Sequence, residues 1–385
     1  MKLKMRMRIL LLCFLLSHML LLSGCWSSKE VQSINFITTL GVDYRDKQFI
    51  AYAQIVDFAN IAKQEGPNQR NEGTIWVGEG KGKTLMLAIY DLYRTAQQKT
   101  LWTHVKAIVL SESVMNEKLE ETLNVLLNSG ELRYTPWMYG TNEDLQTLLT
   151  ASSLLNQSVQ SIELFEPIAL YRQSSEYEPI RIHSMLDGFR EPASTVLIPS
   201  VATDMETWKQ ESNKKARMIY FNGIYLISKK KNIGKVSGQE ADGARYVSYR
   251  KMQQYPLDLQ PETNNSQVML IRNAKSSLSV ASRDQHTVTF NISVDAEASV
   301  LEDKQLAPDA QLQKDVQRRI AEKIRYTFEQ TKAKQMDIYS LEEHLYRKHL
   351  DLWKKLSKDK EHPVANYELG EVKVHVHLLN TTTYK

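Results

Sequence analysis

The chain has 385 residues and a formal net charge of +4, with 24% charged and 42% hydrophobic residues. Residues 1–24 contain four of the basic residues and no acidic residue, so the rest of the chain has no net charge. A neutral body lacks the basic footprint of a nucleic-acid-binding protein. It also lacks the polybasic signal that attracts a protein to anionic lipids.

The N-terminus carries the pattern of a bacterial export signal. Four basic residues precede an apolar run, Ile9–Leu22, whose length of about 14 residues is below the roughly 20 that span a bilayer. The run ends in Leu21-Leu22-Ser23-Gly24-Cys25, which resembles a lipobox. We therefore expect residues 1–24 to be a signal peptide, and residues 25–33 to be the lipid anchor and tether. A plain signal peptide followed by an incidental Cys25 is the alternative.

The expected lipid is a diacylglycerol on the Cys25 sulfur, together with an N-acyl chain on the same residue. Two acyl chains hold a protein on a bilayer stably, whereas one binds only marginally. The only other cysteine, Cys13, leaves with the signal peptide. The folded body is therefore expected to contain neither a disulfide nor a thiol ligand.

Residues 34–200 alternate strand-like and helix-like segments, which predicts an N-terminal α/β domain. Strands are expected at Ile34–Tyr44, Gln48–Phe58, Thr74–Gly80, Val105–Leu110 and Arg133–Gly140. Apolar residues at helical spacing predict helices at Lys83–Gln98, Glu117–Asn128, Asn142–Thr150 and near Ser184–Phe189.

Two polar stretches, Val201–Lys215 and Tyr255–Ser266, are expected to delimit a small middle domain, residues 201–266. Strands are expected there at Ala216–Ser228 and Ile233–Val236.

Residues 267–385 predict a C-terminal α+β domain, an antiparallel sheet with two long helices. Its strands are expected at Gln267–Ala281, His286–Val300 and Glu371–Asn380, and its helices at Ala310–Lys332 and Ser340–Leu356. Ser340 and Glu343 have the spacing of a capping box at the start of the second helix. The whole chain is thus predicted to be a three-domain mixed protein, between α/β and α+β, with mainly antiparallel sheets packed by helices.

The sequence contains no recognisable catalytic motif, and we predict no catalytic residue, no metal site and no cofactor besides the lipid. His375 and His377 are two apart on one strand, but no third ligand lies near them in the sequence, so a solvated strand face explains them better. Gly78, Gly80 and Gly82 precede a helix without the spacing of a phosphate-binding loop, which favours a simple turn.

Five ordered stretches resemble motifs of the Ger(x)C family, the C subunits of bacterial spore germinant receptors. They are Gly24-Cys25-Trp26 with Glu30; Leu40-Gly41-Val42-Asp43; His104-Val105-Lys106 through Leu110-Ser111-Glu112; Asn222-Gly223-Ile224-Tyr225-Leu226 with Gly234 and Glu240; and Asp337-Ile338-Tyr339 with Tyr346-Arg347-Lys348 and Trp353-Lys354. The likeness spans nearly the whole chain after the signal. Two departures are Ser27-Ser28-Lys29, where a charged run is usual, and Tyr339-Ser340, where Phe-Gly is common.

The resemblance implies a three-domain α/β lipoprotein on the outer face of the inner spore membrane. It implies partners as well, a membrane-embedded A subunit and a transporter-like B subunit, in a complex that answers nutrient germinants. No nucleic acid is expected as a partner. One alternative hypothesis is a substrate-binding lipoprotein of a transporter, which needs two lobes around a cleft. Another is an envelope hydrolase, which the absence of catalytic motifs disfavours.

Trp26 directly follows the anchor and precedes the folded body. We expect it to contact either a partner subunit or the lipid interface, because Trp is enriched in both settings.

Overall fold

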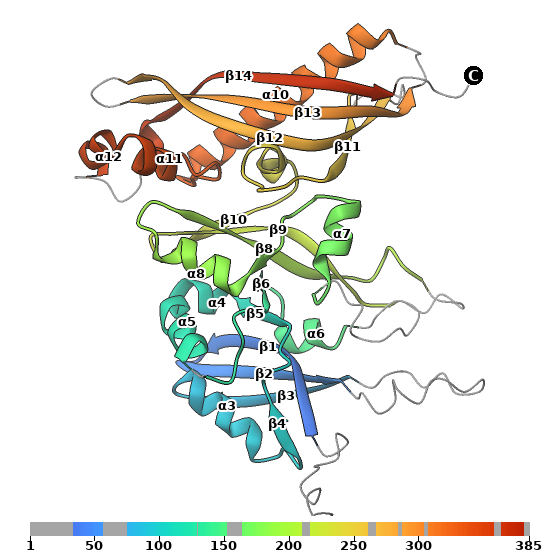
Figure 1. The fold of residues 1–385 in the computed structure, drawn as a ribbon. Helices are drawn as coiled ribbons and strands as arrows, with labels where there is room; N and C mark the ends of the chain where they lie inside the picture. Colours follow the sequence, from blue (N-terminus) through green and yellow to red (C-terminus); the bar gives the residue numbers. More distant parts are fainter. Residues whose placement is uncertain are drawn as a thin grey trace, which may run out of the picture.

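The computed structural model describes residues 34–56, 75–128, 130–151, 164–209, 216–260, 267–283, 287–303, 307–357 and 363–380. Figure 1 shows an elongated molecule in which the first strands and the C-terminal domain lie at opposite ends. Its two sheets are packed by helices, which confirms the predicted fold class.

The larger sheet has ten strands, and its main path runs β10-β9-β8-β6-β5-β1-β2-β3. Strands β1, β5, β6 and β8 run parallel, whereas β2, β3, β9 and β10 are joined by antiparallel hairpins. The strands are β1 (Ile34–Arg45), β2 (Gln48–Val56), β3 (Ile75–Gly82), β4 (Lys99–Leu101), β5 (Ala107–Ser111), β6 (Trp137–Thr141), β7 (Ile180–Arg181), β8 (Thr195–Asp204), β9 (Met218–Ser228) and β10 (Lys231–Val236).

Helices cover both faces of this sheet. One apolar core lies between the sheet and α3 (Leu85–Tyr93), α4 (Glu112–Glu117), α5 (Leu119–Asn128) and α8 (Ile182–Arg190). A second core lies on the opposite face beneath α6 (Leu145–Leu149), next to which α7 (Pro167–Gln173) is found. The parallel strands are buried on both sides, as crossover helices require.

The C-terminal domain packs on the β9–β10 end of the large sheet. Along β9, Ile224 and Leu226 point into the C-terminal core, whereas Tyr225 and Ile227 point into the core beneath α8. Successive strand side chains point to opposite faces, so one strand serves two cores.

The C-terminal sheet has the order β11-β12-β13-β14, formed by β11 (Gln254–Asp258), β12 (Gln267–Arg283), β13 (Val288–Asp303) and β14 (Tyr367–Asn380). It packs with α10 (Asp309–Ala333), α11 (Leu341–Lys348), α12 (Leu350–Ser357) and α9 (Ala244–Val247), and two short 3-10 turns lie at Gly238–Ala241 and Pro363–Asn366.

Three local predictions in this domain were wrong. β14 pairs parallel to β13, so the sheet is mixed. Residues Tyr255–Asp258, expected in a linker, form part of edge strand β11, where Pro256 is tolerated because an edge strand has unpaired backbone positions. The single helix expected at Ser340–Leu356 is two helices, α11 and α12, broken at His349.

The boundary expected at residue 201 falls inside β8, and β9 and β10 continue the same sheet. Strands β8, β9 and β10 are therefore joined to the N-terminal strands by the hydrogen bonds of one sheet. Where the chain divides into independently folding units stays a prediction.

Candidate functional site

The two residues singled out from the sequence, Cys25 and Trp26, lie outside the described residues. Their roles remain predictions. The other four family-like stretches fall largely within the structure, which shows what their polar residues do.

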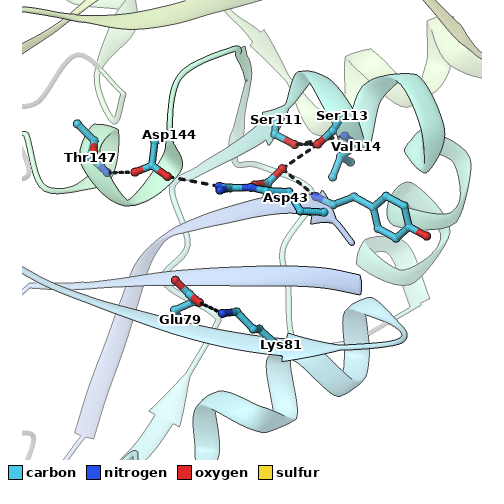
Figure 2. Close-up of polar contacts among 10 residues, drawn as sticks. Asp43, Glu79, Lys81, Ser111, Ser113, Val114, Asp144 and Thr147 are labelled. Atoms are coloured by element: carbon cyan, nitrogen blue, oxygen red, sulfur yellow. Dashed lines mark hydrogen bonds and ion pairs between the residues drawn. The ribbon is translucent and has the colours of Figure 1, made fainter. Parts of the chain in front are cut away.

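Asp43 is the centre of a buried polar cluster at the carboxyl ends of two parallel strands (Figure 2). Asp43 lies two residues before the end of β1 and is 4% exposed, and its carboxylate accepts hydrogen bonds from Ser113 Oγ at 2.8 Å and from the Tyr44 N–H at 2.8 Å. Arg45 forms an ion pair with the same carboxylate. Ser111, at the end of β5, shares a hydrogen bond of 2.8 Å with Ser113 and caps α4 through the Val114 N–H.

Burial alone would raise the pKa of Asp43. The hydrogen bonds from Ser111, Ser113 and Arg45 outweigh burial, so the pKa of this carboxyl lies below its ordinary value. Asp43 therefore stays ionised and fixes the start of α4.

The cluster extends from Arg45 to α6 on the other face of the sheet. Arg45 Nη2 lies 3.3 Å from Asp144 Oδ1, and Asp144 caps α6 by accepting a 2.8 Å hydrogen bond from the Thr147 N–H. Two family-like stretches, Leu40–Asp43 and Leu110–Glu112, thus meet in space and orient the helices that follow β5 and β6. No histidine is hydrogen-bonded to Ser111 or Ser113 among the described residues. The carboxylate that accepts from Ser113 is that of Asp43, which is paired with Arg45 and has a lowered pKa, so the geometry favours a structural cluster over an acyl-transfer site.

A second polar cluster contains the family-like residues of the C-terminal domain. Asp337 Oδ1 and Oδ2 accept hydrogen bonds from the N–H groups of Leu341 at 2.9 Å and Glu342 at 2.7 Å. Complete burial raises the pKa of Asp337 to about 6, although these two N–H groups oppose the shift.

The expected capping box is wrong, because Ser340 adopts a left-handed conformation (φ 53°) and makes no capping hydrogen bond. Asp337 caps the helix instead, from one turn earlier. An aspartate three residues before Ser340 was a visible signal that sequence reasoning missed.

Glu342 connects this cluster to the large sheet. Its Oε1 accepts a 3.1 Å hydrogen bond from Trp353 Nε1, and the same oxygen lies 3.2 Å from Lys229 Nζ at the tip of the β9–β10 hairpin. Within the C-terminal domain, Glu240 of the turn that follows β10 pairs with Lys334 at the end of α10 at 2.6 Å. The interface between the large sheet and the C-terminal domain is therefore held by the Lys229–Glu342 ion pair as well as by the shared core.

A hollow lined mainly by polar and charged residues lies in this interface. It has a volume of about 500 Å³ and is lined by residues of β7, α8 and β8, by the turn after α9, and by α11. Its charged residues are Glu178, Arg181, Asp187, Glu191, Arg250, Glu343 and Arg347. Arg181 stacks on the Trp137 ring at 3.8 Å, and Arg347 pairs with Glu343 at 2.7 Å. Burial raises the pKa of Glu178 despite a hydrogen bond from the Arg250 N–H.

Mixed charges of this kind suit recognition of a polar partner and supply no matched nucleophile and base. Among the described residues, no group of three or more His, Cys, Asp or Glu side chains could hold a metal ion. Within the same part of the chain, no helix has both the length and the apolar character needed to cross a bilayer.

Comparison with protein families gives two matches in tandem. Residues 27–203 match the family described as "Spore germination protein N-terminal domain". Residues 222–382 match the family "Spore germination B3/ GerAC like, C-terminal".

Individual relatives align over shorter lengths. Spore germination protein A3 of Bacillus subtilis (strain 168) is 23% identical over 141 residues, which are 35% of this chain and 36% of the relative. Spore germination protein B3 of the same organism is 24% identical over 136 residues, 34% of each chain. The chain therefore aligns with only about a third of the length of these curated relatives.

The crystal structure of the GerBC protein has a similar fold. The TM-score is 0.52 at 15% sequence identity, and the alignment covers 89% of this chain and 97% of that chain. At this identity the likeness shows the fold alone.

Proposed function

Because the chain belongs to the Ger(x)C family of spore germinant receptor C subunits, we propose that it serves nutrient-triggered germination as a lipid-anchored receptor subunit. It assembles with membrane-embedded A and B subunits, without chemistry of its own. The lipid on Cys25 holds it on the outer face of the inner spore membrane.

The observation that carries this proposal is the tandem order of the two family matches. Together they run from residue 27 to residue 382 with only residues 204–221 between them. The described polar clusters support it, because Ser111 and Asp337 cap helices and Glu342 connects two parts of the fold. Confinement by lipid raises the local concentration of the protein beside membrane-embedded partners, so weak contacts suffice for assembly.

The test combines deletion with co-purification. Deletion of the gene, in a strain without a redundant receptor, is expected to abolish nutrient-triggered germination, and normal germination would refute the proposal. Wild-type protein purified in mild detergent should bring the A and B subunits with it. Cys25→Ala should lose them, and a foreign membrane anchor should restore them. Failure of the wild type to recover either subunit would also refute assembly.

A second candidate is a substrate-binding role, favoured by the 500 Å³ hollow with charges of both signs. Such a hollow suits a small zwitterion. Thermal unfolding with and without amino acids tests it: a rise in Tm that is lost in Arg250→Ala supports binding, and no rise with any of them argues against it. The lining of the hollow comes from the β7–α8–β8 part of the large sheet and from α11 of the C-terminal domain, two unlike units, whereas transporter-binding proteins close two lobes around their ligand.

A further inference from the structure

The β3–α3 unit is unusually rich in exposed apolar side chains. Among the described residues, the three most exposed large hydrophobic side chains are Trp76 at 65%, Tyr90 at 60% and Leu87 at 55%, and all three belong to this unit. Single exposed apolar residues need no explanation, but a group on one unit marks a contact surface.

These three side chains lie on the same side of the sheet, the side that α3 covers. Gly78, Gly80 and Gly82 face α3, and a Cβ on Gly80 would lie 2.2 Å from the Ala88 carbonyl oxygen. Trp76 is next in this row of alternate residues, so it points to the α3 side. Leu87 and Tyr90 are three apart on the outer side of α3, where they are neighbours.

The opposite face of β3 carries no comparably exposed apolar side chain. Ile75 and Val77 are partly buried there against the core beneath α6, and Glu79 and Lys81 form an ion pair of 2.7 Å, as Figure 2 shows. The exposed apolar side chains of this unit therefore lie on the α3 side of the edge strand and on the helix surface.

The unit lies at the end of the molecule where the chain enters the fold (Figure 1). Trp76 pairs with Ile55, and Ile55 pairs with Ile37 of β1, so two strand spacings of about 5 Å separate Ile37 from Trp76. Nine residue steps separate Cys25 from Ile34, which limits the start of β1 to roughly 30 Å from the expected acyl chains. The C-terminal domain is at the far end.

The charge around these side chains favours an anionic surface. Residues 75–101 contain Lys81, Lys83, Arg94 and Lys99 against Glu79 and Asp91, a net charge of +2. The two acids pair with Lys81 and Arg94. Lys83 and Lys99 are exposed and have no ion-pair partner among the described residues.

We propose that the β3–α3 unit lies on the bilayer, with Trp76, Leu87 and Tyr90 at the level of the lipid headgroups. Trp and Tyr are enriched at this depth because they have apolar rings with one polar atom. Lys83 and Lys99 add attraction to anionic headgroups. The inference rests on the proposed lipid anchor, and it adds an orientation: the C-terminal domain and the hollow point away from the membrane.

The test measures the depth of single labels in the acylated full-length protein on vesicles of phosphatidylcholine and phosphatidylglycerol, 7:3. An introduced cysteine is the only free thiol once Cys25 is acylated, so it can carry a nitroxide alone. For nitroxides at Trp76→Cys, Leu87→Cys and Tyr90→Cys, we expect oxygen to accelerate the electron-spin relaxation more strongly than a water-soluble nickel complex does. The matched control is Tyr326→Cys on α10, 45% exposed, where the nickel complex should dominate.

Each result has one meaning. Dominant nickel relaxation at all three positions overturns the proposal. Low accessibility to both reagents, appearing only when the A and B subunits are present, assigns the surface to a protein partner and also overturns it. If the protein without an introduced cysteine takes up label, or does not float with vesicles, the lipid anchor itself is refuted.

Discussion

At the scale of single residues, two buried aspartates have opposite pKa shifts because their surroundings differ. Asp43 receives side-chain hydrogen bonds and an arginine, which lower its pKa. Asp337 has only two backbone donors against complete burial, and its pKa is raised to about 6. The two residues therefore contribute to stability in opposite pH ranges.

Replacing Asp43 by Asn should destabilise the fold by about 2 kcal/mol, because Ser113 and the Tyr44 N–H lose a charged acceptor, whereas Arg45 is half exposed and is solvated by water once its partner is lost. Urea unfolding followed by circular dichroism measures the loss. Asp46→Asn, in the exposed turn that follows, is the control and should change stability by less than about 0.5 kcal/mol. Equal effects of the two substitutions would show that the buried cluster adds nothing.

The raised pKa of the Asp337 carboxyl fixes the direction in which the stability of the fold depends on pH. The native state binds the proton more tightly than the unfolded state, so the free energy of unfolding falls as the pH rises from about 4 to about 6. The loss amounts to roughly 3 kcal/mol, since each pKa unit corresponds to about 1.4 kcal/mol. Urea unfolding of wild type and Asp337→Asn between pH 4 and 7 should show this slope in the wild type alone. Parallel profiles would contradict the assignment.

At the scale of elements, periodic apolar patterns predicted most strands and helices, because they depend on burial of one face. The long strands β12 and β13 and the helix α10 lie within a few residues of their expected ends. The sequence patterns did not predict the features that depend on tertiary contacts. Apolar spacing continues across His349, yet α11 ends there, and β11 exists because β12 offers it a partner.

The candidate site could be predicted only in part. Asp43, Ser111 and Asp337 were visible as family-like residues. The contact of Asp43 with the start of α4, which Ser111 caps, depends on two strands far apart in sequence meeting at one edge. The Asp337 cap is local, and the Ser340 capping-box pattern hid it. The interface hollow was invisible, since its lining comes from five separate segments.

Gly234, in β10, should resist substitution for two reasons. Its φ of 128° is rarely adopted by other residues, and a Cβ there would lie 2.3 Å from Met336 Cε. Gly234→Ala is expected to destabilise by about 2–3 kcal/mol in urea unfolding. Gly130→Ala, with φ 65° and open space around it, is the control and should cost about 1 kcal/mol. If the Gly234 variant loses no more unfolding free energy than the control variant, the contact with Met336 is unimportant.

At the scale of the whole molecule, the large sheet and the C-terminal domain share a core, and the Lys229–Glu342 ion pair joins them. The chain between β8 and β9 is the interval that neither family match includes. On either side of this interval, β8 and β9 pair along their length, from Thr195 opposite Ser228 to Asp204 opposite Met218.

A protease of broad specificity, such as subtilisin, should cut first between residues 204 and 218, and next after Asp258, where β11 ends. Helix α10 should resist, because its apolar face is packed. The two halves made by the first cut should elute together in gel filtration, since the β8–β9 ladder and the common core still hold them. Separation of the fragments without denaturant would contradict this view of the sheet.

The two-sided strand β9 has an evolutionary consequence. Its neighbouring residues Leu226 and Ile227 belong to different cores, so a substitution at one is compensated in the C-terminal domain and at the other beneath α8. Across related sequences, adjacent positions of β9 should therefore vary independently of each other. Ile224 and Leu226 should instead co-vary with residues of the C-terminal core, and Tyr225 and Ile227 with residues of the core beneath α8. One strand would then evolve under two separate packing constraints.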